Sequence, residues 1–225
     1  MVIKEILTKA SDNLKGLEYC DANKEAMFIL ARLLDKDMSY LYLNLDKEID
    51  SSLVKKYEEI ISLRKTGYPF HYIFKEKDFY DLNLYIEPGV LIPRYETEIL
   101  VEYVIDYVKD NNLENLNIVE VGSGSGAIGL TIAKHLPHSN ITCLDISDIA
   151  IKVGNINKQK LNLKNINFIK SDIFSKLDEK YINSTDIIIS NPPYIETNTL
   201  NELQKDVINF EPNLALDGGE DGLYF

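Results

Sequence analysis

Cysteine is scarce in this sequence, and long apolar runs are missing. The two cysteines, Cys20 and Cys143, lie far apart among 225 residues and outside the spacings that hold a structural zinc ion. A disulfide framework is therefore excluded, and no metal site is expected. No run approaches about 18 uncharged apolar residues, and the charged amino terminus lacks the apolar stretch of a secretory signal. We predict a soluble, cytoplasmic protein without membrane contact.

Positive charge is also in short supply. Lys and Arg together number 24 and Asp and Glu 36, which gives a formal net charge of −12. Such a protein repels polyanions unless its basic residues cluster. A mild run of lysines over residues 152–170 is interpreted as a solvated helix face. We therefore expect no direct binding to nucleic acid. We also expect a monomer.

The period of the apolar residues changes along the chain. Up to about residue 66 they recur at helical spacing, which predicts a small helical domain over residues 1–68. Its helices have N-cap candidates at Asp21 or Asn23 and at Asp50 or Ser51. Residues 71–86 are rich in Tyr, Phe and Ile with short polar breaks, which predicts a β-hairpin within a linker over residues 69–90.

Short apolar runs alternate with amphipathic stretches from Asn117 onward. This alternation predicts βαβ units with right-handed crossovers and a parallel sheet, and hence an α/β domain over residues 91–225. Such sheets bind ligands beyond the carboxyl ends of their strands. The predicted strands are residues 118–121, 141–144, 166–169 and 187–189, and the predicted helices are residues 96–108, 127–135 and 149–160.

A glycine loop (residues 122–126) follows the first of these strands and comes directly before a predicted helix. Glycines at alternate positions allow a sharp turn and a close approach to a ligand, which indicates a nucleotide-like cofactor. Gly124, Gly126 and Gly129 formally meet the dinucleotide fingerprint. Glu120 followed by Gly-x-Gly-x-Gly is instead similar to the first motif of the S-adenosylmethionine-dependent methyltransferases. The candidate cofactor ligands in the loop are Gly122, Ser123, Gly124, Ser125 and Gly126.

The next two strands each end in a carboxylate. Asp145, about 20 residues beyond the loop, can accept hydrogen bonds from both hydroxyls of a ribose. The alternative is that Asp145 caps the following helix, although Ser147 and Asp148 could cap it equally well. Asp172 can accept a hydrogen bond from an adenine amino group while Ile173 packs on the ring. The alternative for Asp172 is a simple turn carboxylate.

The Asn-Pro-Pro-Tyr segment (residues 191–194) follows the fourth strand. Its two prolines remove two backbone donors and fix φ, so the adjacent carbonyls face outward as acceptors. The Asn191 side chain and the Pro192 carbonyl can together bind both hydrogens of a planar NH2 group, and Tyr194 offers a flat face for stacking. We predict catalytic roles for Asn191, Pro192 and Tyr194, substrate binding by these residues and Pro193, and a cofactor contact for Asn191.

Such a cradle suits methyl transfer to an amide or aromatic amine. Transfer from a sulfonium is an in-line displacement, so a weakly nucleophilic nitrogen must be aligned with the methyl carbon. Oxygen acceptors around the NH2 group also stabilise the positive charge that develops on nitrogen. Positioning therefore supplies most of the catalysis, and no general base is required.

Asn-Pro-Pro-Tyr is similar to the motif of methyltransferases that act on the amino groups of adenine, cytosine or glutamine. Residues 90–98, 126–129 and 210–222 further resemble the glutamine N5-methyltransferases that modify peptide chain release factors. This resemblance covers nearly the whole chain. It implies a Rossmann-like class I methyltransferase fold, preceded by a helical N-terminal domain for substrate recognition and a β-hairpin. The implied substrate is the glutamine of the Gly-Gly-Gln motif in release factors.

The resemblance also implies roles for particular residues. The glycine loop and Asp145 would bind S-adenosylmethionine with Ile173 at the adenine, and the Asn-Pro-Pro-Tyr segment would bind the glutamine side chain. The chain departs from the family at Tyr95, where proline is usual, and at Ile173, which is often aromatic. Family members also continue beyond the Asp-Gly-Leu stretch, so we expect a truncated chain whose incomplete sheet has its fourth strand at an open edge.

Other functions remain open. An adenine-specific DNA or RNA methyltransferase could use the same Asn-Pro-Pro-Tyr segment, but the chain has no basic stripe. An S-adenosylmethionine-binding fragment without catalytic activity is a second possibility. A nicotinamide oxidoreductase is a third, and it is disfavoured because no suitable His or Tyr-Lys pair is found. We interpret His71, His135 and His138 as structural or surface residues.

Overall fold

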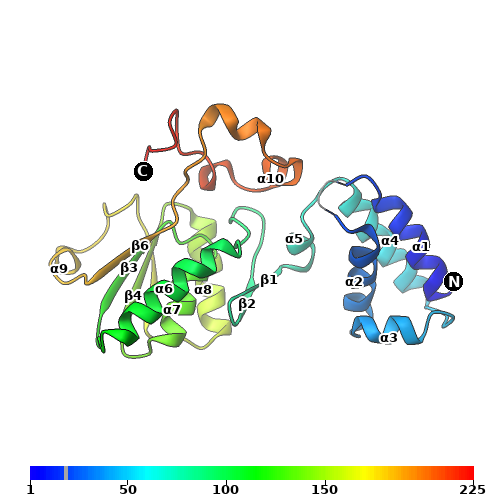
Figure 1. The fold of residues 1–225 in the computed structure, drawn as a ribbon, viewed down its shortest axis with the longest axis horizontal. Coiled ribbons are helices and arrows are strands. Elements are labelled where there is room, and N and C mark those ends of the chain that lie inside the picture. The colour runs from blue at the N-terminus through cyan, green and yellow to red at the C-terminus, as the bar shows by residue number, and fades with distance from the viewer. Residues whose placement is uncertain (18–19) are drawn as a thin grey trace. The chain divides into compact units, whose positions relative to one another are not determined.

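The computed structural model describes residues 1–17 and 20–225, which divide into two compact units (Figure 1). The first comprises Met1–Ile73 together with Gln204–Asp206. The second comprises Phe74–Leu203 and Val207–Phe225. Among the described residues, no helix is long and apolar enough to cross a membrane.

The first unit is a group of helices around a small apolar core. Ile3, Leu14, Ile29, Leu41 and Tyr57 are fully buried in it. The Tyr57 hydroxyl donates a hydrogen bond to the Ala26 carbonyl at 2.9 Å, so this buried polar group has a partner. The helices are α1 (Ile3–Leu14), α2 (Ala22–Leu34), α3 (Met38–Leu43), α4 (Ser51–Lys65) and α5 (Phe70–Phe74).

Carboxylates begin three of these helices. Asp21 accepts a hydrogen bond from Lys24 N at 3.1 Å, Asp37 from Tyr40 N at 2.7 Å and Asp50 from Ser52 N at 2.9 Å. A side-chain oxygen at this position satisfies a backbone donor that the helix leaves unpaired. Of the candidate caps in the sequence, Asp21 and Asp50 are confirmed.

The β-hairpin is shorter than the sequence predicts. It is formed by β1 (Glu76–Phe79) and β2 (Leu82–Tyr85), which pair antiparallel from Glu76↔Tyr85 to Phe79↔Leu82. The prediction that it starts at residue 71 was wrong, because residues 70–74 form α5. Pro69 starts this helical turn, since its carbonyl accepts hydrogen bonds from Tyr72 N and Ile73 N at 3.0 and 3.3 Å.

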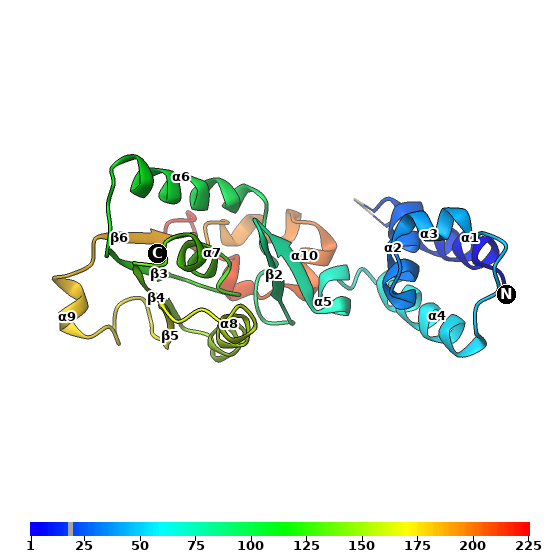
Figure 2. The ribbon, with the colours of Figure 1, turned by 90° about the horizontal axis from the view of Figure 1, so that it is seen from below.

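The second unit contains a parallel four-stranded sheet, as predicted. Its strands are β3 (Asn117–Val121), β4 (Asn140–Asp145), β5 (Ile166–Lys170) and β6 (Ile187–Ser190), in the spatial order β5-β4-β3-β6. Three helices, α6 (Glu96–Asp110), α7 (Ala127–His135) and α8 (Asp148–Lys160), lie side by side along one face (Figure 2). The remaining elements are α9 (Glu179–Ile182), η1 (Thr197–Glu202), α10 (Lys205–Phe210) and η2 (Asn213–Ala215).

One buried amide joins the hairpin to the glycine loop. Asn157 on α8 is completely buried; its Oδ1 accepts a hydrogen bond from Tyr85 N at 2.6 Å, and its Nδ2 donates to Tyr85 O at 2.9 Å and to Ser125 O at 3.1 Å. A buried amide with its hydrogen bonds satisfied fixes the segments it connects. The hairpin therefore supports the loop from behind.

Replacing this amide should be costly. We expect Asn157→Ala to lower the free energy of unfolding by about 3 kcal/mol, since it leaves buried groups of Tyr85 and Ser125 unpaired. Asn155→Ala is the matched control, because within the described part of the chain the Asn155 side chain bonds only to Ile151 O on its own helix. Urea denaturation of both variants measures the difference, and equal losses would contradict the bridging role.

Candidate active site

The two predicted functional segments leave neighbouring strands of the sheet. The chain runs from β3 to β4 and β5 on one side, whereas β6 pairs with β3 on the other, so the strand order reverses between β3 and β6. Ligands of such sheets bind at this reversal, beyond the carboxyl ends of the strands. Val121 pairs with Ser190, whose Oγ donates to Val121 O at 2.9 Å. The glycine loop and the Asn-Pro-Pro-Tyr segment therefore start side by side.

Left-handed backbone explains the glycines of the loop. Gly122, Gly124 and Gly126 have φ of 72°, 53° and 81°, a conformation that favours glycine. A Cβ atom at Gly122 or Gly124 would meet nothing within 4 Å, whereas one at Gly126 would lie 2.7 Å from Phe168 Cζ. Open space therefore lies above the first two glycines, and the third packs against the protein.

The serines of the loop are both buried. Among the described residues, Ser123 Oγ has no hydrogen-bond partner, and the Ser125 carbonyl is bound by Asn157. A buried hydroxyl without a partner is costly unless a ligand or water satisfies it. The open space and this unpaired hydroxyl both fit a loop that holds a polar ligand.

Asp145, the predicted ribose ligand, is tied to the loop. Its Oδ2 accepts a hydrogen bond from Gly124 N at 2.7 Å and its Oδ1 accepts one from Ser147 N at 2.9 Å. The alternative role as the cap of α8 was wrong, because Ser147 is the N-cap and its Oγ accepts from Ala150 N. A carboxylate can accept about four hydrogen bonds, so Asp145 retains capacity for two hydroxyls.

Exposed apolar residues follow the carboxyl ends of β4 and β5. Asp172 is exposed and Ile173, with φ of 45°, is 40% exposed. Asp145 pairs with Lys170, so Ile146 and residues 171–173 follow adjacent strand ends. Ile146, which the sequence analysis did not single out, is 48% exposed. Two exposed isoleucines beside a carboxylate suit a flat ring next to a ribose.

The Asn-Pro-Pro-Tyr segment is fixed by the chain that follows it. Ile195 N donates to Leu216 O at 3.1 Å, and Gly218 N donates to Ile195 O at 2.8 Å. A Cβ at Gly218 would lie 2.9 Å from Pro193 O, and one at Gly222 would lie 2.6 Å from Tyr194 O. These glycines therefore allow close packing against the backbone of the segment. The sequence analysis quoted this glycine-rich stretch but assigned it no role.

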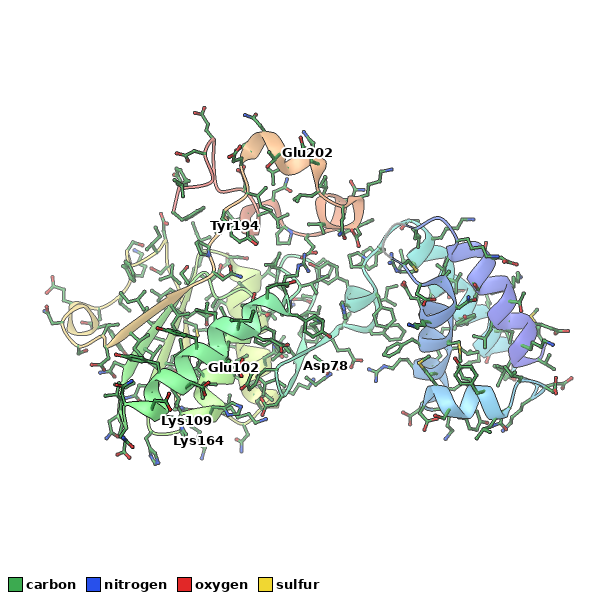
Figure 3. All side chains as sticks on the ribbon, in the orientation of Figure 1. Asp78, Glu102, Lys109, Lys164, Tyr194 and Glu202 are labelled. Carbon is green, nitrogen blue, oxygen red and sulfur yellow. The ribbon has the colours of Figure 1, made fainter. Side chains whose placement is uncertain are left out.

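The side chains of the segment remain accessible. Asn191, Pro192 and Pro193 are half-buried and Tyr194 is 68% exposed. Figure 3 shows Tyr194 where the chain leaves β6. Asn191 Nδ2 donates to Thr97 Oγ1 on α6 at 3.3 Å. The structure thus brings Asn191 beside the glycine loop and adds Thr97, which sequence reasoning missed.

Glu120 lies behind the loop. Its Oε2 accepts hydrogen bonds from Gly129 N at 3.0 Å and from Cys143 Sγ at 3.1 Å. Complete burial raises the pKa of the Glu120 carboxyl from 4.5 to about 7. A Cβ at Gly129 would overlap Cys143 Sγ and lie 2.5 Å from Glu120 Oε2. Glu120 therefore bonds to the first turn of α7, and Gly129 is required by packing.

Two family models match the chain. The model described as the methyltransferase small domain matches residues 96–220, and the model described as the PrmC N-terminal domain matches residues 5–74. Each falls largely within one of the two units.

Curated relatives match over the full length of this chain. It is 41% identical over 226 residues to the release factor glutamine methyltransferase of Clostridium acetobutylicum, covering 100% of this chain and 78% of that protein. It is 38% identical over 227 residues to the protein of the same name from Clostridium botulinum, covering 100% and 79%. Among solved structures it is similar to the SAM-dependent methyltransferase from Agrobacterium tumefaciens, with 21% identity, a TM-score of 0.39 and coverage of 45% and 33%.

Alanine at two loop glycines should have different effects. We expect Gly124→Ala to weaken S-adenosylmethionine binding at least about tenfold, because its methyl group enters the open space, and to cost only about 1 kcal/mol of stability. Gly126→Ala should cost about 3 kcal/mol, because it adds a clash with Phe168 to the backbone strain. Calorimetry and urea denaturation measure both effects. Unchanged cofactor affinity in Gly124→Ala would contradict the placement of the cofactor.

The stability of the protein should depend on the protonation of Glu120. Between pH 4.5 and about 7 the folded protein keeps a proton that the unfolded chain loses, so this carboxyl contributes less to stability as the pH rises. Relative to Glu120→Gln, the wild type should lose about 3 kcal/mol across this range. Urea denaturation of both proteins at several pH values tests this, and a difference that does not vary with pH would be inconsistent with it.

Proposed function

Since the chain belongs to the family of release factor glutamine methyltransferases, we propose that it methylates the side-chain amide of a glutamine in a peptide chain release factor. It is an S-adenosylmethionine-dependent methyltransferase. We take the acceptor to be the glutamine of the Gly-Gly-Gln motif. One observation carries the proposal. The glycine loop and the Asn-Pro-Pro-Tyr segment directly follow Val121 and Ser190, which are paired residues of β3 and β6.

The cofactor, when bound, supplies an electrophilic methyl group on a sulfonium sulfur. In the proposed arrangement, the glycine loop approaches it with its backbone and Ser123 Oγ gains a partner. The Asp145 carboxylate accepts hydrogen bonds from the ribose hydroxyls, and Ile146 and Ile173 contact the adenine ring with Asp172 nearby. Support comes from the open space over Gly122 and Gly124 and from the unused acceptor capacity of Asp145.

The acceptor amide is oriented by oxygen atoms. Asn191 Oδ1 and the Pro192 carbonyl accept hydrogen bonds from its two N–H groups, Pro193 holds the backbone rigid, and Tyr194 covers the planar amide. This directs the nitrogen toward the methyl carbon. As the N–C bond forms and the C–S bond breaks, positive charge develops on nitrogen, and the two acceptors stabilise it until a proton passes to water.

The rest of the chain fits an enzyme acting on a protein. We propose that the helical domain, residues 1–68, recognises the release factor and that residues 69–90 link it to the methyltransferase domain, residues 91–225. Release factors act on ribosomes, so we place the enzyme in the cytoplasm. Both halves of the site come from one chain, which favours a monomer. The net charge of −12 disfavours direct binding to nucleic acid.

Methyl transfer from labelled cofactor tests the function. The protein is incubated with a release factor, with DNA or with RNA, and the label should appear on the release factor at its Gly-Gly-Gln motif. A release factor with this glutamine replaced should remain unlabelled. Label on nucleic acid alone would contradict the proposal and indicate an adenine-specific DNA or RNA methyltransferase. Cofactor binding without label on any substrate would indicate an inactive binding module.

Removing the Asn191 carboxamide should abolish turnover. We expect Asn191→Ala to lower kcat at least about a hundredfold, because the acceptor amide loses both orientation and charge stabilisation. The Kd of S-adenosylmethionine should stay within a few fold, since the glycine loop and Asp145 are intact. Steady-state kinetics and calorimetry provide the two values, with Asn155→Ala as the control. A near-normal rate in Asn191→Ala would rule out the proposed cradle.

A further inference from the structure

A hydrogen bond joins the side chain of Asn191 to a distant part of the sequence. Asn191 Nδ2 donates to Thr97 Oγ1 at 3.3 Å, although 94 residues separate them. Thr97 lies in the first turn of α6, and Asn191 follows β6. Both side chains are half-buried, so the bond is partly shielded from water.

The orientation of this amide decides what it can bind. A carboxamide accepts only through its oxygen and donates only through its nitrogen. With Nδ2 bonded to Thr97, Oδ1 faces the other way, and among the described residues it has no hydrogen-bond partner. Oδ1 is therefore the atom of Asn191 that can accept a hydrogen bond from the NH2 group of the acceptor amide and stabilise positive charge on its nitrogen.

Thr97 is itself held in place by a partly buried ion pair. Glu211 is buried; its Oε1 accepts a hydrogen bond from Arg94 Nη2 at 2.6 Å and its Oε2 accepts one from Ile92 N at 3.0 Å. Arg94 Nη1 also donates to Ile92 O at 2.9 Å, and Thr97 N donates to Arg94 O at 3.1 Å. The start of α6 is therefore tied to Glu211, close in sequence to the glycines that pack under the Asn-Pro-Pro-Tyr segment.

We propose that Thr97 is a positioning residue for methyl transfer, held by the Arg94–Glu211 pair, and that its hydroxyl, by accepting the hydrogen bond from Nδ2, holds the Asn191 side chain where Oδ1 is available to the acceptor amide. Thr97 acts through Asn191 and does not touch the reacting atoms. The proposal rests on the proposed function, because it assigns Asn191 the acceptor role described there. It adds α6 to the elements that build the substrate site.

Two substitutions separate the hydroxyl from the shape of the side chain. Thr97→Val keeps the volume and removes the hydroxyl, and Thr97→Ser keeps the hydroxyl. We expect Thr97→Val to lower kcat about tenfold with the KM for release factor within about threefold, because orientation is lost while binding of the protein surface is retained. Thr97→Ser should recover most of the rate. Thr185→Val, at the amino end of β6 and away from the site, is the matched control for loss of a threonine hydroxyl.

A second readout does not depend on turnover. Proton exchange of the Asn191 side-chain NH2, followed by NMR and assigned by its absence from Asn191→Ala, reports the hydrogen bond to Thr97. Exchange should accelerate in Thr97→Val and stay slow in Thr97→Ser and Thr185→Val. Normal exchange in Thr97→Val would overturn the proposal, whether or not the wild type methylates release factor.

The combined outcomes distinguish the two proposals. Faster exchange together with a normal kcat in Thr97→Val would overturn the positioning role. Equal loss of rate in Thr97→Val and Thr97→Ser, with a lowered urea midpoint in both, would show a merely structural role and also overturn it. A wild type that labels no release factor would overturn the proposed function and, with it, the positioning role, whereas the exchange data would still report whether the hydrogen bond to Thr97 is present.

Discussion

The parallel pairing of β3 with β6 is the constraint on which the site depends. It sets the glycine loop and the Asn-Pro-Pro-Tyr segment at neighbouring strand ends, with Val121 opposite Ser190. A shift by one residue would turn the side chains of β6 to the opposite face and displace Asn191 from the loop. In the proposed reaction the donor and the acceptor amide meet at this point, so the register of one strand pair fixes their separation.

Rigidity around this point comes from contacts behind it. Asn157 on α8 joins the glycine loop to the hairpin, and Gly218 and Gly222 allow close packing under Pro193 and Tyr194. These contacts do not involve Asn191 Oδ1 or the Pro192 carbonyl oxygen, the two proposed acceptors. A mechanism that relies on orientation rather than on a general base needs binding groups that are already held in position before the substrate binds.

The sequence predicts local structure well and distant pairings poorly. Alternating apolar runs predicted the four strands and the helices between them, since this periodicity is a local property. The start of the hairpin was wrong because aromatic residues 70–74 suit a helical turn as well as a strand. The bonds of Thr97 to Asn191 and of Arg94 to Glu211 join residues about a hundred positions apart, and nothing local marks such pairs. The direction of the Glu120 carboxylate, toward α7, was likewise set by packing.

The most direct test is a crystal structure of the protein with S-adenosylhomocysteine and a glutamine-containing peptide. The account predicts that Asn191 Oδ1 and the Pro192 carbonyl each lie within hydrogen-bonding distance of the glutamine amide nitrogen, with that nitrogen facing the sulfur across the glycine loop. A glutamine bound elsewhere, or an Asn191 side chain turned away from the loop, would contradict it.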